Sequence, residues 1–293
     1  HVLDAQVNRG PLAERDASRR EAALLSEKLA YLEQTSTTAE SAAVGHERAR
    51  VQELAGLLKR FGDGVPPFVP NGHFYSPIHS IEEVERDRSR IFASSDRVVG
   101  IDLRTTEQLA LLAKLGEICA DQPFTDRPEG GRRYGFENSA YSYGDGLCLH
   151  GMLRHLKPKW LIEIGSGHSS SLTLDTRDQF LGGDLHCTFI EPYPDLLHSL
   201  LKHGDRDSVR ILPQRVQDVD LSIFKELQAG DVLFIDSTHV SKVGSDVNRL
   251  YFDVLPILAK GVYVHIHDIF YPSEYSEVLV IDDRRAWNEL YIF

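Results

Sequence analysis

The chain has 293 residues, of which 42% are hydrophobic and 26% are charged, and this balance excludes both a disordered chain and a fibrous one. Its formal net charge is -12 at pH 7, which argues against nucleic acid or an anionic membrane as the partner, because neutralising phosphates needs clustered Lys and Arg. No apolar run approaches the roughly 18 residues that a membrane helix requires. We therefore expect a cytoplasmic protein that acts on a small-molecule substrate, with neither nucleic acid nor membrane as a partner.

The N-terminal part of the chain is rich in Ala, Glu, Arg and Leu, and Ala22, Leu25 and Leu29 recur at helical spacing. A polar patch at residues 35–38 breaks this stripe, which favours a solvated helical arm over a sustained coiled coil. A homo-oligomer formed through the arm stays open. The composition predicts three regions: a helical arm, a Gly- and Pro-rich linker and cap region, and a Rossmann-like domain, over residues 1–60, 61–135 and 136–293.

The three cysteines, Cys119, Cys148 and Cys187, are odd in number, far apart and surrounded by apolar residues. This spacing is typical of neither a disulfide framework nor a zinc site. We expect them to be reduced residues of the core.

Strand-like apolar runs alternate with helix-like segments in the last half of the chain. The runs lie at residues 160–164, 185–190, 208–212, 231–236 and 261–267. The clearest helix carries its apolar stripe from Val247 to Leu258. This alternation predicts an α/β fold with a doubly wound, mostly parallel, Rossmann-like sheet. In such sheets ligands bind beyond the carboxyl ends of the strands, so chemistry is expected where each strand stops.

The ends of the first three runs carry features of a nucleotide site. Gly165 and Gly167 follow the first run and open a helix, which allows a tight turn and close approach of a ligand. Ser170 stands where the dinucleotide fingerprint has its third glycine, which disfavours NAD. Glu191 ends the second run, 24 positions (191 − 167) beyond the second glycine, where a carboxylate can accept both hydroxyls of a ribose. Asp218 follows the third run, either near an adenine amine or as a helix cap.

Acids and histidines follow the fourth and fifth runs. Asp236 ends the fourth run, and His239 lies in the polar loop after it. The fifth run contains His265 and His267 and stops at Asp268. Carboxylates at neighbouring strand ends can hold a divalent cation, and a histidine can serve as base or ligand. His265 is expected to be a hydrogen-bonded core residue, which leaves His239 as the better candidate for a base.

In order and spacing, these motifs resemble class I S-adenosylmethionine-dependent methyltransferases, and more closely the bacterial methyltransferase-24 group. The resemblance covers roughly residues 70–290 and rests on Glu163-Ile-Gly-Ser-Gly-His-Ser169, Phe189-Ile-Glu191-Pro, Phe234-Ile-Asp236-Ser-Thr-His239-Val, His265-Ile-His-Asp268, Tyr141-Ser-Tyr-Gly-Asp145 and Ser245-Asp246-Val247. It implies S-adenosylmethionine as the cofactor. The implied cofactor residues are Glu163, Gly165 and Gly167 beside the methionine part, Glu191 at the ribose, Asp218 near the adenine, and Tyr143 of the shared loop.

Metal-dependent relatives carry an acid after the fourth strand and two polar ligands after the fifth. Asp236, His267 and Asp268 match these positions, although His267 replaces an acid, so a divalent cation stays open. Family members also continue past residues 287–291 into two further strands, whereas this sequence stops at Phe293. Whether the chain is a fragment that lacks those strands therefore stays open.

The leading functional hypothesis is O-methylation of a small hydroxylated metabolite or sugar by direct displacement. Asp236 and His239 are the candidate catalytic residues, with His239 removing the proton of the acceptor hydroxyl. One alternative is a nicotinamide-dependent oxidoreductase, which shares the sheet and the ribose acid but would keep the third glycine. The other is a non-catalytic scaffold whose helical arm binds a partner.

Overall fold

The computed structural model describes residues 68–93, 98 and 100–293. The chain divides into two units, residues 1–88 and 89–293, which are considered separately. The helical arm predicted for residues 1–60 lies outside the described residues, so an oligomer formed through it stays a prediction. In the first unit an irregular segment leads to helix α4 (Ile81–Arg86), where the Ser80 hydroxyl accepts a hydrogen bond from the Glu83 N–H as N-cap.

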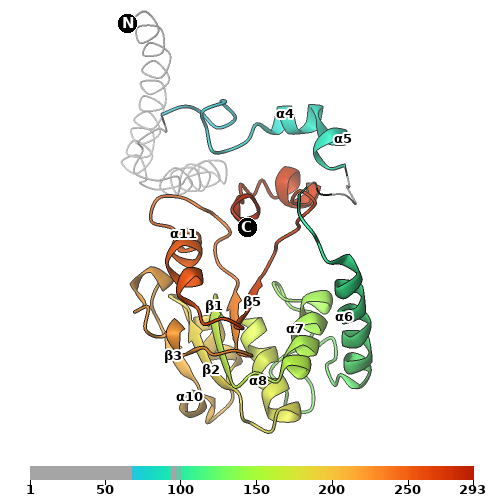
Figure 1. Ribbon diagram of the computed structural model, residues 1–293, viewed down its shortest axis with the longest axis vertical. Helices are drawn as coiled ribbons and strands as arrows, with labels where there is room; N and C mark the ends of the chain where they lie inside the picture. Colours follow the sequence, from blue (N-terminus) through green and yellow to red (C-terminus); the bar gives the residue numbers. More distant parts are fainter. Residues whose placement is uncertain (1–67, 94–97, 99) are drawn as a thin grey trace, which may run out of the picture. The chain divides into compact units, whose positions relative to one another are not determined.

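The second unit contains a five-stranded parallel sheet (Figure 1). Its strands are β1 (Trp160–Ile164), β2 (His186–Ile190), β3 (Arg210–Leu212), β4 (Val232–Ile235) and β5 (Tyr263–Ile266), in the order β3-β2-β1-β4-β5. Every strand falls inside a predicted apolar run, and the predicted doubly wound α/β sheet is confirmed. The strand order reverses at β1, which creates the switch point where ligands bind in open parallel sheets.

Helical segments precede β1, lie between successive strands and follow β5. They are α5 (Arg88–Ile91), α6 (Thr105–Ile118), η1 (Cys119–Asp121), α7 (Tyr143–Leu156), α8 (His168–Phe180), α9 (Asp195–Leu200), α10 (Asp205–Ser208), η2 (Val216–Asp218), η3 (Phe224–Glu226), α11 (Asp246–Arg249), η4 (Leu250–Val254), η5 (Leu255–Ile257), η6 (Val278–Asp282) and η7 (Glu289–Tyr291). No helix in the described part of the chain is long and apolar enough to span a membrane. Figure 1 shows α7 and α8 on one side of the sheet and α11 on the other.

Successive residues of a strand point to opposite faces, so β1 contributes to two separate cores. Leu161 packs in the core beneath α7 and α8, where Leu153 and Leu172 are fully buried. Ile162 and Ile164 pack in the other core with residues of η3, η4 and the segment after β3. The expected Val247–Leu258 helix is present as α11, η4 and η5, and its stripe is buried as predicted. Burial on both faces explains why the runs of the central strands β1, β2 and β4 are continuously apolar.

The cysteines carry free thiols, as the sequence predicted. Cys187 lies in the core and Cys119 is half-buried, but the prediction that all three belong to the core is wrong for Cys148, which is exposed. The reason is its place on α7: the buried face of that helix is formed by Leu149 and Leu153, and Cys148 lies beside it.

An ion-pair network, here the Arg133 network, fixes the loop that precedes α7. The buried guanidinium of Arg133 donates to Asp175 of α8 at 2.7 Å and to Asp205 of α10 at 2.7 Å. The backbone N–H groups of Arg133 and Tyr134 also donate to the Asp175 carboxylate. Burial lowers the pKa of Arg133, but the hydrogen bonds to Asp205 and Asp175 outweigh it and raise the pKa above its ordinary value. The loop is thereby held against α8, next to the carboxyl edge of the sheet.

Candidate active site

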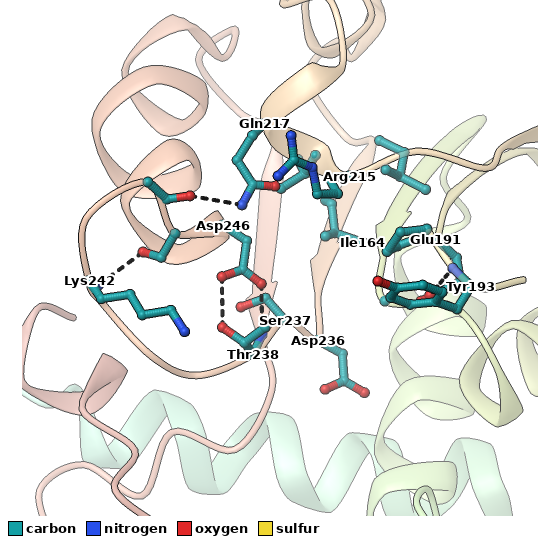
Figure 2. A pocket seen from close by; sticks show the side chains of 16 residues that line it. Ile164, Glu191, Tyr193, Arg215, Gln217, Asp236, Ser237, Thr238, Lys242 and Asp246 are labelled. Carbon is teal, nitrogen blue, oxygen red and sulfur yellow. Dashed lines mark hydrogen bonds between the residues drawn. The ribbon is translucent and has the colours of Figure 1, made fainter. Parts of the chain in front are cut away.

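A cavity of about 430 Å³ opens at the carboxyl ends of β1, β2 and β4 (Figure 2). Its walls come from the end of β1, the loop between β2 and α9, the segment around η2, and the loop between β4 and α11. Glu191 and Tyr193 lie on one side of the view, and Thr238 and Asp246 lie on the other. The cavity therefore occupies the switch point at which the fold predicts a ligand.

The glycine turn after β1 forms part of this cavity. Gly165 has a φ of +80°, and a Cβ added there would lie 1.7 Å from the carbonyl oxygen of Asp236. The Asp236 N–H in turn donates to the Ile164 carbonyl at 2.9 Å, so the ends of β1 and β4 meet at this point. The packing of β1 against β4 therefore requires glycine here, in addition to the tight turn and close ligand approach that the sequence suggested. Gly167 has an extended φ of -175° and faces the flexible Leu196 side chain.

Glu163 lies behind the glycine turn and is fully buried. Its Oε1 accepts hydrogen bonds from the hydroxyls of Ser169 at 2.6 Å and Ser170 at 2.8 Å, at the start of α8. Its Oε2 finds no hydrogen-bond partner among the described residues. Burial raises the pKa of Glu163 to about 8, against the opposing effect of the two hydroxyls. Ser170 also accepts the Gly167 N–H at 3.0 Å, so the residue that replaces the third glycine holds the turn itself.

Glu191 lines the cavity, as the sequence predicted for a ribose acid. Its two oxygens accept the backbone N–H groups of Tyr193 at 2.8 Å and Ser166 at 3.2 Å. A carboxylate has about four acceptor positions, so two such bonds leave room for ligand hydroxyls. Glu191 thus ties the end of β2 to the glycine turn and still presents acceptors to the cavity.

Four of the six predicted cofactor residues lie outside the described lining of the cavity, namely Glu163, Gly167, Asp218 and Tyr143. Asp218 forms an exposed ion pair with Arg215 at 2.8 Å, while its neighbour Gln217 lines the cavity and donates to the Gly244 carbonyl at 3.1 Å. The Tyr143 ring stacks on Phe136, and its hydroxyl donates to Asp126 at 2.7 Å. The structure does not bring Asp218 or Tyr143 to the cavity, and their contact with a cofactor stays a prediction.

The structure brings Asp236, His239 and Asp268 together, as expected from the common edge of β4 and β5. The His239 ring is buried, with its Nε2 3.4 Å from Asp236 Oδ1 and 3.9 Å from Asp268 Oδ2. Its Nδ1 lies 2.9 Å from Glu289 Oε2. We call these four residues the His239 cluster. Because Asp236 also lines the cavity, the cluster and the cavity are adjacent.

The carboxylates of the His239 cluster set the charge of its imidazole. Burial lowers the pKa of His239, but the hydrogen bonds to Asp236 and Glu289 outweigh burial and raise the pKa to about 9. At neutral pH the ring therefore carries a proton. Burial raises the pKa of Asp145, at the start of α7, the His267 charge lowers it, and Asp268 and Asp236 raise it further. Asp145 thus faces the same group of charges.

Sequence reasoning missed Glu289. The residue is fully buried in η7, and it lies 50 positions from the histidine that it contacts. The available signal was an acid inside an aromatic segment, between Trp287 and Tyr291. The Trp287 ring packs on the His239 ring with centroids 4.4 Å apart, which explains the aromatic character of that segment.

The predicted cation ligands are not assembled. Among the described residues, no three His, Cys, Asp or Glu side chains are placed to hold a metal ion. The His239 ring lies beside both Asp236 and Asp268. His267 Nε2 lies 3.5 Å from Asp268 Oδ1. His265 packs edge-on against Phe234, and burial lowers its pKa to about 4. It is only half-buried, and the hydrogen bond expected for its ring is not present among the described residues.

Comparison with known proteins places these residues in a family. The model of a methyltransferase domain family matches residues 162–269. An uncharacterized protein of Archaeoglobus fulgidus is 34% identical over 188 residues, which cover 61% of this chain and 84% of that protein. The chain belongs to the methyltransferase domain family. The resemblance predicted from the sequence is therefore confirmed, and the matched range of this methyltransferase contains the glycine turn, Glu191, His239 and Asp268 but not Glu289.

Two solved structures are more distantly similar to the methyltransferase. One is a Plasmodium falciparum chain provisionally assigned as a protein-L-isoaspartate O-methyltransferase, in complex with S-adenosyl-L-homocysteine, with 13% identity, a TM-score of 0.32, and coverage of 64% of this chain and 82% of that chain. The other is a methyltransferase from Geobacter sulfurreducens, with 17% identity, a TM-score of 0.25, and coverage of 56% and 77% respectively.

Proposed function

We propose that this methyltransferase binds S-adenosylmethionine in the cavity beside β1 and β2 and methylates a hydroxyl group of a small metabolite or sugar. One observation carries the proposal: Asp236 lines the cavity and also contacts the Nε2 atom of His239 at 3.4 Å. A cofactor site and a group that can exchange a proton with an acceptor are thus neighbours. Such adjacency is what group transfer to a hydroxyl requires.

The described residues fit the cofactor in volume and in polarity. A cavity of about 430 Å³ is in the usual range for small-molecule sites. Glu191 offers acceptors for ribose hydroxyls, and Ile164 and Val216 supply apolar wall. Glu163 Oε2 and the hydroxyl oxygens of Ser166 and Ser237 are buried without partners in the part of the chain that the structure describes. Buried polar atoms normally have partners, and of these three residues Ser237 lines the cavity, so its hydroxyl is suited to a polar group of a ligand.

S-adenosylmethionine, when bound, supplies a methyl group carried on a positively charged sulfur. The residues of this chain would supply the proton acceptor: neutral His239 takes the proton of the acceptor hydroxyl at Nε2. Asp236 and Asp268 lie beside that nitrogen and stabilise the imidazolium that results. Because the pKa of His239 is about 9, only a minority of the protein has this neutral base at neutral pH. A cytoplasmic location also stays a proposal, based on composition.

Calorimetric titration with S-adenosylhomocysteine and, separately, with NAD tests the cofactor. We expect S-adenosylhomocysteine to bind and NAD not to bind. Binding of NAD alone would favour the nicotinamide-dependent oxidoreductase, and binding of neither would favour the non-catalytic scaffold.

The acceptor is tested with S-adenosylmethionine labelled in its methyl group and a set of small hydroxylated metabolites and sugars. The proposal expects label in an ether product that survives alkaline treatment. Label found only in esters or amines would overturn O-methylation of a hydroxyl, while leaving the methyltransferase family assignment intact.

A further inference from the structure

The backbone of His239 has an unusual conformation that distant residues hold in place. Its φ is +59°, in the left-handed region that residues with a Cβ rarely occupy. The His239 carbonyl accepts the N–H groups of Asn288 at 3.0 Å and Glu289 at 3.2 Å. The Asn288 side chain accepts the Ser241 N–H at 2.6 Å, which pins the same loop from its other side. Such a conformation persists only where the surroundings over-determine it, and here residues 288 and 289 do so.

The side chain of His239 is held by the same segment. Glu289 Oε2 lies 2.9 Å from Nδ1, and the Glu289 side chain is fully buried. The Trp287 ring packs on the imidazole, which limits rotation of the ring. With Nδ1 engaged by Glu289, the opposite nitrogen, Nε2, faces Asp236 and Asp268. Backbone, ring plane and ring orientation are therefore all determined by residues 287–289.

A buried carboxylate is costly to desolvate, so its presence needs a partner of opposite charge or strong hydrogen bonds. The other oxygen of Glu289, Oε1, has no hydrogen-bond partner among the described residues. The bond to His239 therefore helps to compensate this buried group, and the Tyr251 hydroxyl is a second polar neighbour of Glu289. A carboxylate behind an imidazole orients the ring and stabilises its protonated form, a role that unrelated folds use for catalytic histidines.

We propose that Glu289 is a positioning residue of the methyl-transfer site, holding the His239 ring through Nδ1 so that Nε2 is presented to the acceptor hydroxyl. The inference rests on the proposed function, in which His239 is the base. When the hydroxyl O–H bond breaks, its proton forms the Nε2–H bond, and the Nδ1–H group keeps its hydrogen bond to Glu289. The proton then leaves from Nε2 to water.

The test uses the full chain and needs no acceptor. A Nδ1–H group in a 2.9 Å bond to a buried carboxylate is shielded from water, so wild-type protein at pH 7 should give a slowly exchanging, strongly downfield proton resonance. His239→Gln, which removes the ring, assigns that resonance. Glu289→Gln keeps the shape and removes the charge, and Glu289→Asp keeps the charge with a shorter reach. Asp205→Asn is the matched control, because Asp205 is a buried carboxylate of the Arg133 network.

We expect the His239 resonance to be lost in Glu289→Gln, weakened but present in Glu289→Asp, and unchanged in Asp205→Asn. If Glu289 had a merely structural role, the His239 resonance would respond to Glu289→Gln in the same way as to Asp205→Asn. Absence of the resonance from wild type, or its persistence in Glu289→Gln, would overturn the inference. If Glu289→Gln fails to fold, the inference is tested by the presence of the resonance in the wild type and by its weakening in Glu289→Asp.

Calorimetry with S-adenosylhomocysteine separates this inference from the proposed function. Glu289 lies outside the described lining of the cavity, so Glu289→Gln should bind this probe within twofold of wild type. Failure of the wild type to bind it would reject the proposed cofactor and leave the ring measurement intact. A large loss in Glu289→Gln alone would show that Glu289 supports the cavity and would reject a role confined to His239.

Discussion

The Arg133 guanidinium and the His239 imidazolium are both buried cations next to carboxylates, but their surroundings suit different roles. In the Arg133 network, Asp175 and Asp205 accept hydrogen bonds from a guanidinium that keeps its proton at every physiological pH. In the His239 cluster the cation is an imidazolium with a pKa of about 9, and the carboxylates at its Nε2 are partly exposed. A permanent charge with buried partners fixes a loop, whereas a titratable charge beside a cavity can exchange a proton.

The largest effect expected from this comparison is on turnover. His239→Ala should reduce methyl transfer by roughly 10²–10⁴-fold, the usual contribution of a general base, with little change in S-adenosylhomocysteine affinity. Arg133 variants that remain folded should keep most of their turnover. Labelled methyl transfer and calorimetry measure the two quantities. Full turnover in His239→Ala would show that His239 is not the base, and the catalytic role given to the His239 cluster would be wrong.

The Arg133 network should dominate stability. Arg133→Met leaves the buried carboxylates of Asp175 and Asp205 without their main partner, and breaking a buried pair in this way costs about 3–5 kcal/mol. Lys202, 3.2 Å from Asp175, offsets part of the loss. Urea unfolding measures the change, with the exposed pair Arg215→Met as the control, expected to cost at most about 1 kcal/mol. Similar losses in the two variants would show that burial of the network contributes little.

Alkaline pH should remove the proton of His239 and leave that of Arg133 in place, so it should affect the two sites differently. The pKa of His239 is raised from 6.5 to about 9 on folding. Its contribution to stability is therefore complete below pH 6.5 and is lost as pH rises through about 9, a change on the order of 3 kcal/mol. Turnover should change in the opposite direction and rise up to about pH 9, because the neutral base becomes populated.

Unfolding of wild type and His239→Gln across this pH range measures the stability difference. The two curves should converge at high pH. Curves that stay parallel through pH 9 would mean that His239 does not titrate there. The Arg133 network provides the internal reference, since its guanidinium does not lose its proton in this range.

Glu191 sharpens the comparison as a carboxylate that accepts hydrogen bonds from the backbone N–H groups of Tyr193 and Ser166. Glu191→Ala should weaken S-adenosylhomocysteine binding by roughly 1–3 kcal/mol, the scale for hydrogen bonds to a charged group. Calorimetry measures the loss, and Glu226→Ala, in a surface pair with Arg210, is the control. Unchanged affinity in Glu191→Ala would mean that Glu191 does not bind the cofactor and only stabilises the glycine turn.

Features with a local or periodic origin were predictable from the sequence. Each of the five strands follows from an apolar run, and for the central strands β1, β2 and β4 the reason is that strands covered on both faces have no polar alternation. The meeting of Asp236 and Asp268 was also predictable, since the carboxyl ends of parallel strands share one edge. Glu191 reached the cavity for the same reason.

Other features depended on how distant segments pack. That strand packing also requires Gly165 became clear only from the position of the Asp236 carbonyl. The partners of Tyr143 and Asp218 are set by neighbouring loops, where no periodicity guides prediction. Sequence alone therefore determined the sheet, its ligand-binding edge and the acids on that edge. Only the tertiary structure decided that Glu289 joins His239 across 50 positions and that the imidazole holds a proton, because burial and charge at one point depend on the packing of segments far apart in the chain.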